Sequence, residues 1–192
     1  MIIGPSPSMF PSHDRYAYSV IDRRPDYAWP DDKRLAFYLC ISVEHFAFAA
    51  GVGEDLASVG APQGQRNFGW RDYGQRVGLW RLVSLCDELE LPPTFAVNSL
   101  IYDYRPEILE RICGRGNEIV AHGRTSSELQ RGMWEADEAW MIRQVTDTIA
   151  RREGAPPKGW LGPGFSETGL TPDLLKEAGY SYLLDWPADD QP

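Results

Sequence analysis

The chain has 192 residues, of which 43% are hydrophobic, so it is long and apolar enough for one domain with a buried core. Its formal net charge of −9 argues against a nucleic-acid partner, because phosphate binding needs a basic surface. The N-terminus has neither the basic segment nor the apolar run of a signal peptide, and no stretch approaches the ~18 apolar residues of a membrane span. We therefore expect a cytoplasmic protein that does not bind a membrane.

Residues 1–33 are rich in Pro, Tyr, Asp and Arg and show no hydrophobic period. We expect them to form an extended N-terminal arm, followed by one domain over residues 34–192. The aromatic side chains of the arm suit a subunit interface better than free solvent, and on this ground we expect a homo-oligomer. A disordered tail is the alternative, although such tails usually contain fewer aromatic residues.

Five short apolar runs, separated by segments with apolar residues at helical spacing, predict strands that alternate with helices. The expected strands are residues 34–43, 94–98, the run that ends at His122, 159–164 and 180–184. The expected helices cover about residues 73–89, 104–113, 134–152 and 171–178. The near-continuous apolar run at 34–43 is typical of a strand that is buried on both faces.

Residues 46–73 form a long segment between the first strand and the first helix. The segment is rich in Gly, Ala and Ser, and it is longer than the usual loop of ~2–6 residues between a strand and a helix. Because it follows the first strand, we expect it to be a loop that covers the mouth of the active site.

The alternation of strands and helices predicts an α/β fold with a parallel sheet and right-handed crossovers. We favour a (β/α) barrel over a doubly wound nucleotide-binding sheet. The Gly-x-Gly at Gly114–Gly116 follows a helix and precedes a strand, which is the wrong order for cradling phosphate. Five strands are too few to close a barrel of the usual ~250 residues. We therefore expect an incomplete copy of a longer barrel; an open sheet with a covered edge is the alternative.

Residues with polar groups cluster after every expected strand. These residues are Glu44, Asn98, His122, Trp160 and Asp185. Because the carboxyl ends of parallel strands carry the chemistry of such folds, we expect an active site at this edge of the sheet. Gly123 permits the chain to turn directly after His122. The alternative for His122 is a buried, hydrogen-bonded structural histidine.

Five segments, taken together and in this order, carry a family resemblance. They are Ile41–Glu44, Asp72–Trp80, Asn117–Gly123, Gly159–Trp160 and Asp185–Asp190. The combination resembles the polysaccharide deacetylase superfamily, and in particular its allantoinase-like branch of cytoplasmic enzymes that act on small cyclic amides and related C–N bonds. The resemblance covers the chain from Arg34 onward. It implies a distorted (β/α) barrel that hydrolyses an amide, often an N-acetyl group, with about five βα units present.

The resemblance also implies a set of site residues, from which this chain departs. In the metal-dependent members, the first strand supplies an aspartate base and an aspartate ligand, and the third strand supplies two histidine ligands. Later motifs supply an arginine, an aspartate and a histidine acid. The corresponding positions here are Ser42 (base), Glu44 (metal carboxylate), His122 and Ser126 (the two histidines), Trp160 (arginine) and Asp185 (aspartate). The motif with the last histidine would lie beyond Pro192.

These departures bear on the cofactor. A zinc-like site needs about three protein ligands, and Glu44 and His122 supply two, with Ser126 a poor third. His45 is a substitute to consider, but consecutive strand residues point to opposite faces. The allantoinase-like branch also lacks the full ligand set. We therefore expect either no cofactor or one divalent, zinc-like metal held by Glu44 and His122.

From this pattern we expect a hydrolase of a C–N bond other than a peptide bond, acting on a ureide or N-acetyl group of a small molecule. Glu44 is the expected general base, with a pKa raised by burial. His122 is expected to be a metal ligand or a donor to the developing oxyanion. The expected substrate-binding residues are Asp72, Arg76 and Asp185 for polar edges and Trp160 for a ring.

Two other functions stay open at this point. A non-catalytic carbohydrate- or heterocycle-binding pseudoenzyme on the same scaffold fits the presence of Ser42, Ser126 and Trp160 where reactive residues are expected. A metal-dependent barrel lyase or aldolase would need more than two side-chain ligands and a carbonyl substrate. Arg76 has an alternative of its own, an ordinary surface ion pair.

Overall fold

The computed structural model describes most of the chain, namely residues 13–49, 64–187 and 189–191. The chain divides into two units, with the boundary between Ala36 and Phe37. The first unit contains two short 3-10 helices, η1 (Ile21–Arg23) and η2 (Pro30–Asp32), and neither helix has a buried residue. The second unit contains the sheet.

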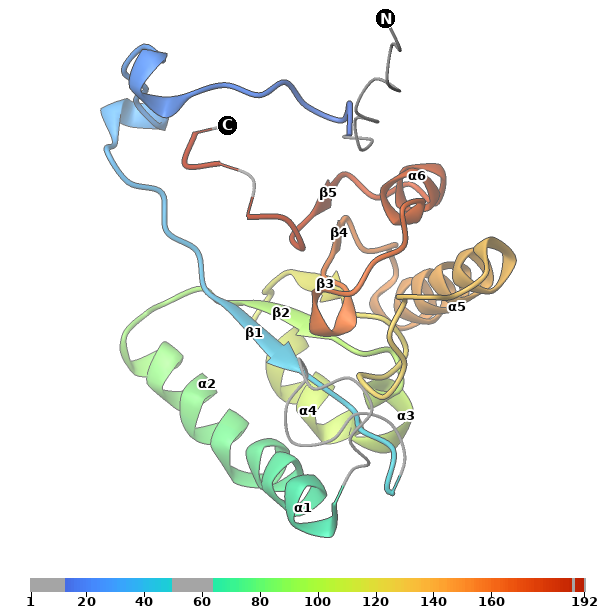
Figure 1. The fold of residues 1–192 in the computed structure, drawn as a ribbon. Coiled ribbons are helices and arrows are strands. Elements are labelled where there is room, and N and C mark those ends of the chain that lie inside the picture. The colour runs from blue at the N-terminus through green and yellow to red at the C-terminus, as the bar shows by residue number, and fades with distance from the viewer. Residues whose placement is uncertain (1–12, 50–63, 188, 192) are drawn as a thin grey trace, which may run out of the picture. The chain divides into compact units, whose positions relative to one another are not determined.

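The second unit is built on five parallel strands whose spatial order is their order in the sequence. The strands are β1 (Cys40–Val43), β2 (Thr94–Val97), β3 (Ile119–Ala121), β4 (Gly159–Trp160) and β5 (Tyr182–Leu183). Helices connect each strand to the next, as the alternation in the sequence predicted (Figure 1). An all-parallel sheet in this order is the arrangement of a (β/α) barrel. The predicted α/β fold is therefore confirmed.

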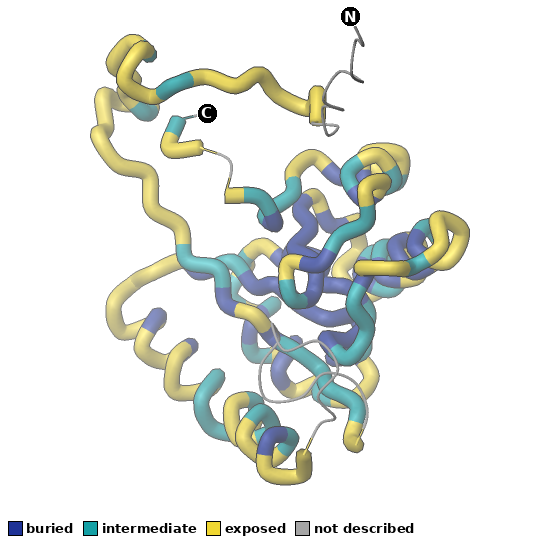
Figure 2. The backbone as a smooth tube through the Cα atoms, in the orientation of Figure 1, coloured by how far each residue is buried: buried dark blue, intermediate teal, exposed yellow. Residues whose placement is uncertain are grey.

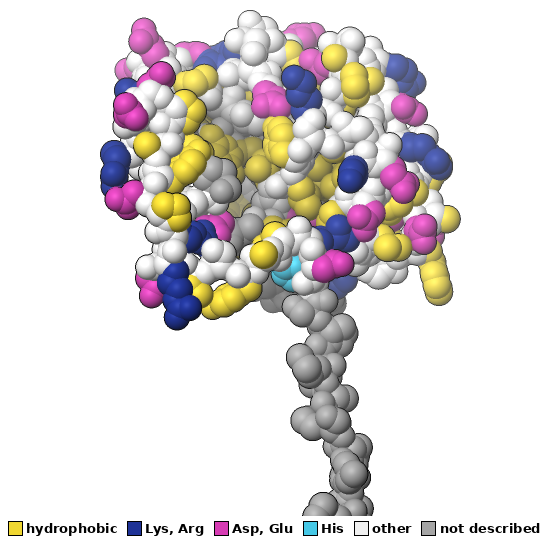
Figure 3. All heavy atoms as spheres, turned by 90° about the horizontal axis from the view of Figure 1, so that it is seen from above, with side chains coloured by type: hydrophobic (Ala, Val, Ile, Leu, Met, Phe, Trp, Pro, Cys, Tyr) yellow, Lys and Arg dark blue, Asp and Glu magenta, His cyan; other side chains and the backbone are white. Residues whose placement is uncertain are grey.

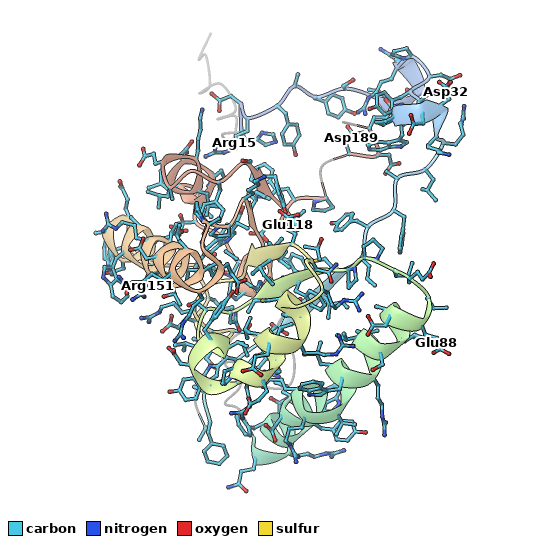
Figure 4. The ribbon with its side chains drawn as sticks, turned by 180° about the vertical axis from the view of Figure 1, so that it is seen from behind. Arg15, Asp32, Glu88, Glu118, Arg151 and Asp189 are labelled. Atoms are coloured by element: carbon cyan, nitrogen blue, oxygen red, sulfur yellow. The ribbon has the colours of Figure 1, made fainter. Side chains whose placement is uncertain are left out.

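The connecting helices differ widely in length. They are α1 (Gln65–Tyr73), the π-helical turn η3 (Gly74–Gly78), α2 (Leu79–Glu88), α3 (Ile101–Tyr104), α4 (Pro106–Cys113), α5 (Glu135–Glu153), the 3-10 turn η4 (Pro163–Phe165) and α6 (Thr171–Glu177). The exposed residues Glu88, at the end of α2, and Arg151, on α5, lie on the outside (Figure 4). Among the described helices, none has both the length and the apolar character that a membrane crossing requires.

Two apolar clusters lie on the two faces of the sheet. Phe95 and Val97 of β2 point into the main core, which the helices cover. Ala96, between them, belongs to a smaller cluster with Val120 and Leu161 on the other face. This alternation follows the period of two of a strand. Burial is accordingly concentrated in the strands, whereas the outer turns of α2 and α5 are largely exposed (Figure 2).

The first strand is shorter than the predicted strand at 34–43. β1 begins at Cys40, and the upstream side chains of Leu35, Phe37 and Tyr38 are 78%, 77% and 67% exposed. The apolar run predicted burial on both faces. Within the described part of the chain, however, β1 pairs with β2 alone, so no neighbouring strand covers its other edge.

Part of the segment predicted to be a loop at 46–73 is helical. α1 begins at Gln65 and continues through η3 into α2 without leaving helical backbone angles. The only residue of α1 that is buried is Asn67, so no apolar stripe marked this helix in the sequence. Residues 50–63 of the predicted loop lie outside the described residues.

Candidate active site

The pairing of β1, β2 and β3 brings three polar side chains to the same face of the sheet. Ser42 pairs with Ala96, and Ala96 pairs with Val120, so these residues share one face. The residue two positions further along each chain segment continues on that face, just beyond the strand. These three residues are Glu44, Asn98 and His122.

Glu44, His122 and Ser126 form a cluster at this edge. Ser126 Oγ donates a hydrogen bond to Glu44 Oε1 over 2.7 Å, and His122 Nε2 lies 3.4 Å from the same oxygen. His122 and Ser126 are 3% and 0% exposed, whereas the Glu44 side chain keeps 27% of its surface exposed. The carboxylate is therefore held by buried groups and still open to solvent. The two residues that the sequence singled out at the ends of the first and third strands do come together.

The ring of His122 is oriented by its second nitrogen. Nδ1 lies 2.5 Å from the carbonyl oxygen of Leu161, which accepts hydrogen bonds only, so Nδ1 carries a hydrogen. Nε2 is therefore the nitrogen that faces Glu44. The Nε2–Oε1 contact becomes a hydrogen bond only when one of the two groups holds a proton, so the pair is arranged to exchange one. His122 is both buried and hydrogen-bonded, and it also contacts a reactive acid.

Asn98 ties the three strand ends together. Its Oδ1 accepts hydrogen bonds from the backbone N–H of His45 at 2.7 Å and of Ser126 at 3.1 Å, and its Nδ2 donates to the carbonyl of His122. Asn98 is 0% exposed. Sequence reasoning noted it as a polar residue after a strand but gave it no role. Its place between two strands that each end in a candidate site residue was the available signal.

The pKa of Glu44 lies below its ordinary value. Burial by itself raises this pKa, but hydrogen bonds from His122 and Ser126, together with the positive charges of His122 and Arg71, outweigh burial. The expectation that burial raises the pKa of Glu44 is therefore wrong. The carboxyl is ionised at neutral pH, which is the state that a general base needs.

A cavity of about 290 Å³ lies beside the segment that follows Glu44. Its walls combine aromatic rings with charged groups, among them Phe46, Phe68, Tyr104, Arg71, Asp72 and Arg105. Gln75 also lines the cavity, and its side-chain amide donates a hydrogen bond to the backbone carbonyl of Glu44. The wall of this cavity is thus bonded to the backbone of the candidate base, while Glu44 itself lines a second cavity of about 250 Å³ that shares Arg71 and Gln75 with the first.

Of the two predicted substrate-binding residues on this helical segment, Asp72 lines the cavity and Arg76 does not. Asp72 forms ion pairs with Arg76 at 2.7 Å and with Arg105 at 3.4 Å, and the Arg76 side chain is 65% exposed. Arg76 thus has the geometry of the alternative, a surface ion pair. The residues that reach the site are instead Arg71 and Gln75, which lie four apart and share a helix face.

Trp160 lies in the main core, so its predicted role of stacking on a substrate ring does not fit. It is 0% exposed, its indole N–H donates to Gln130 Oε1 at 3.2 Å, and its ring packs edge-on against Tyr180. The pairing of Trp160 with Ala121 places it on the face that the helices cover. Trp160 therefore follows the pattern of a functional residue after a strand but points away from the site.

Asp185 is buried, with 8% of its surface exposed, and the charge of His122 acts on it. Its Oδ1 accepts a hydrogen bond from the backbone N–H of Gly162 at 2.7 Å. Burial raises the pKa of Asp185 to about 7; the bond from Gly162 and the charge of His122 lower it, and Glu167 raises it further. Asp185 is thus tied to the loop after β4 and does not line the cavity. Sequence reasoning did not identify Glu167.

The residues present do not fit a metal site of the usual kind. Glu44 and His122 offer two donor atoms, and the third position is occupied by Ser126, whose hydroxyl already donates to Glu44. In the described part of the chain, no group of three or more His, Cys, Asp or Glu side chains could hold a metal ion. A zinc site with one open position uses about three protein ligands. The donor set formed by Glu44 and His122 is therefore one ligand short of such a site.

The chain is similar to known deacetylases and to an allantoinase. It is 26% identical over 110 residues to the peptidoglycan deacetylase of Helicobacter pylori, and the matched region covers 57% of this chain and 37% of that protein. The structure superposes on that of Puue allantoinase with a TM-score of 0.73 and 20% identity, covering 92% of this chain and 63% of the other. It superposes on a probable polysaccharide deacetylase from Pseudomonas aeruginosa PAO1 with a TM-score of 0.74 and 24% identity, covering 91% and 63%.

No protein-family model matches the sequence. The chain spans less than two thirds of the length of each of these proteins. The chain is thus similar in sequence to a peptidoglycan deacetylase, and in fold to an allantoinase and a probable polysaccharide deacetylase.

Proposed function

We propose that this chain carries the general-base part of a hydrolase that cleaves a C–N bond other than a peptide bond, in a ureide or an N-acetyl group. The observation that carries the proposal is the ionised Glu44 carboxylate, held by Ser126 and facing His122 Nε2, at the carboxyl ends of β1 and β3. A partly exposed carboxylate with buried hydrogen-bonding partners suits proton transfer, because its position is fixed and solvent can still reach it.

The reaction assigned to these groups is addition of water to an amide carbonyl. Glu44 takes a proton from the water while the water oxygen forms a bond to the carbonyl carbon. The resulting tetrahedral intermediate breaks its C–N bond, and the proton held by Glu44 passes to the departing nitrogen. When Nε2 of His122 is protonated, it carries a hydrogen that can be donated to the developing oxyanion. Ser126 keeps Glu44 Oε1 in place throughout.

A small substrate fits this site better than a polymer. The adjoining cavity of about 290 Å³ is at the lower end of the usual range for small-molecule pockets. Its aromatic rings and guanidinium groups complement a flat molecule with several carbonyl oxygens, such as a cyclic ureide. Asp72 and Arg71 are the groups that we assign to the polar edges of such a molecule. The cytoplasmic location and the homo-oligomeric state remain proposals from the sequence.

The test is turnover of a panel of cyclic ureides and N-acetylated amino sugars by the full chain, with and without added zinc. We expect Glu44→Gln to lower kcat/KM at least about 100-fold, because the variant keeps the shape of the residue but loses the base. Glu88→Gln is the matched control, since Glu88 is exposed and lies outside the site, and it should change kcat/KM less than twofold. Full activity of Glu44→Gln would refute the assignment.

A second candidate function is supported by the absence of a third ligand at Ser126 and by the burial of Trp160. On this reading, the chain binds a carbohydrate or a heterocycle without hydrolysing it. Calorimetric binding of a panel compound without turnover, in the presence or absence of zinc, would favour this function over hydrolysis.

A further inference from the structure

Two carboxyl groups, those of Asp185 after β5 and Glu167 before α6, lie close enough to interact with each other. One oxygen of each has a donor: Asp185 Oδ1 accepts from the N–H of Gly162 at 2.7 Å, and Glu167 Oε2 accepts from the indole N–H of Trp186. The other two oxygens, Asp185 Oδ2 and Glu167 Oε1, are buried and have no hydrogen-bond partner. A buried carboxylate oxygen without a donor is costly, so this arrangement needs an explanation.

The surroundings of Asp185 Oδ2 are rich in acceptors. A Cβ atom placed on Gly162 would lie 2.7 Å from Asp185 Oδ2, 2.9 Å from the carbonyl oxygen of Ser166 and 3.1 Å from Gln130 Oε1, so three oxygens converge on this glycine. Of the titratable groups around Asp185, Glu167 from the loop before α6 raises its pKa and His122 from the end of β3 lowers it. A proton on the carboxyl pair would give this cluster of acceptors a donor.

We propose that Asp185 and Glu167 share one proton, and that Glu167 is through this proton a positioning residue for His122. The pKa of Asp185, which burial raises to about 7 with a contribution from Glu167, agrees with a proton that is retained near neutrality. Two carboxyl groups that interact this directly cannot both ionise without cost, which is the general behaviour of paired carboxyls.

The connection from the pair to His122 runs through a single peptide group. The carbonyl of Leu161 accepts the hydrogen of His122 Nδ1, and the N–H of the same peptide group, which belongs to Gly162, donates to Asp185 Oδ1. Because a trans peptide directs its C=O and N–H to opposite sides, His122 and Asp185 bind the two ends of one dipole. When the pair loses its proton, the added negative charge polarises this peptide and strengthens the carbonyl as an acceptor. The protonation state of the pair therefore changes how strongly the Leu161 carbonyl holds the Nδ1 hydrogen of His122, the residue whose Nε2 faces Glu44.

The primary test is a carbon-13 NMR titration of the Asp185 side-chain carboxyl in the full chain, which needs no substrate. We expect Asp185 to titrate near neutral pH in the unmodified protein and at a clearly lower pH in Glu167→Gln, because the Gln amide donates a hydrogen and carries no charge. Asp137→Asn, a change at an exposed position on α5, should leave the titration of Asp185 unchanged. An Asp185 that titrates in the ordinary range of aspartate in the unmodified protein overturns the proposal, and this result does not require any variant to fold.

The second test rests on the proposed hydrolase function. If the chain is active, the limb of its pH–rate profile near neutrality should move to lower pH in Glu167→Gln. The limb should be absent in Asp185→Asn, because Glu167 is then the only carboxyl of the pair and stays ionised at all pH values above the acid range. A profile that is identical in the unmodified protein and both variants would contradict the role of the pair in tuning His122. If no substrate is turned over, the proposed function fails, but the NMR titration still decides whether the proton is shared.

Discussion

Ser126 Oγ and Glu44 Oε1 are joined by a hydrogen bond of 2.7 Å that spans 82 residues of sequence. The same carboxylate oxygen faces His122 Nε2 at 3.4 Å, so one oxygen of Glu44 is engaged by two buried residues. Ser126 stands where the resemblance to metal-dependent deacetylases places a second histidine. The serine thus has a structural use of its own, which is to position the candidate base and hold its pKa down.

Replacing Ser126 with Ala should raise the pKa of Glu44, because one of the hydrogen bonds that stabilise the ionised form is lost. Glu44 acts as a base only when ionised, so the acidic limb of the pH–rate profile should move to higher pH. Turnover at neutral pH should fall about fivefold, which corresponds to roughly 1 kcal/mol for one hydrogen bond. Ser84→Ala, at an exposed position on α2, is the control. A profile of Ser126→Ala that superposes on the unmodified one would contradict this role.

Asn98→Ala should destabilise the protein by roughly 2–4 kcal/mol, because it removes the partner of the His45 N–H and the amide that donates to the carbonyl of His122, while the N–H of Ser126 keeps its bond to the carbonyl of His45. The measurement is urea denaturation followed by circular dichroism. Asn117→Ala removes a partly exposed amide that accepts one local bond from Arg115, and it should cost less than about 1 kcal/mol. Equal losses in the two variants would show that Asn98 does not hold the strand ends together.

Much of the fold was predictable because it depends on local patterns. The strands before Glu44 and His122 are apolar runs, and the spacing of apolar residues marks α4 and α5. The meeting of Glu44 with His122 followed from one rule, that parallel strands end at a common edge. The same rule failed for Trp160, because a two-residue strand gives too little alternation to show which face its side chain takes.

Other features depend on contacts between distant segments, which no local pattern contains. The bond between Ser126 and Glu44 and the meeting of Glu167 with Asp185 both require the folded backbone. The role of Gln75 could not be predicted, because it depends on a helix that continues from α1. The sequence of α1 did not reveal that helix, since its single buried residue is polar. The raised pKa expected for Glu44 was wrong because burial was visible in the sequence but its hydrogen-bond partners were not.

The stability of the protein should fall as the pH rises from about 4 to about 7, through Asp185. The pKa of this group is raised in the folded state to about 7 from an ordinary value of 3.8, so the folded protein binds more protons than the unfolded chain in that window. The stabilisation is complete below the unfolded value and is lost as the pH rises through the folded value. A shift of this size corresponds to roughly 4 kcal/mol.

The measurement is the free energy of unfolding in urea at several pH values. Asp185→Asn cannot titrate, so its stability should vary less over this window than that of the unmodified protein. Asp137→Asn is again the control, because Asp137 is exposed and should leave the pH dependence as it is. A stability that rises between pH 4 and 7 to the same extent in all three proteins would rule out this contribution of Asp185.

Gly123→Ala should disturb the turn that follows His122 for two separable reasons. The φ angle of Gly123 is +63°, which costs a residue with a Cβ roughly 1 kcal/mol or more, and the added Cβ would lie 2.7 Å from Pro163 Cγ. Gly132 has a φ of +83° with no atom within 4 Å of its Cβ position, so Gly132→Ala isolates the cost of the backbone angle. We expect Gly123→Ala to lose roughly 1–3 kcal/mol more than Gly132→Ala in urea denaturation, since the Pro163 ring must move.

Because Pro163 follows the Leu161–Gly162 peptide that binds His122, turnover should also fall in Gly123→Ala and stay unchanged in Gly132→Ala. Equal stability and equal turnover of the two variants would show that the Gly123–Pro163 contact does not fix the position of His122.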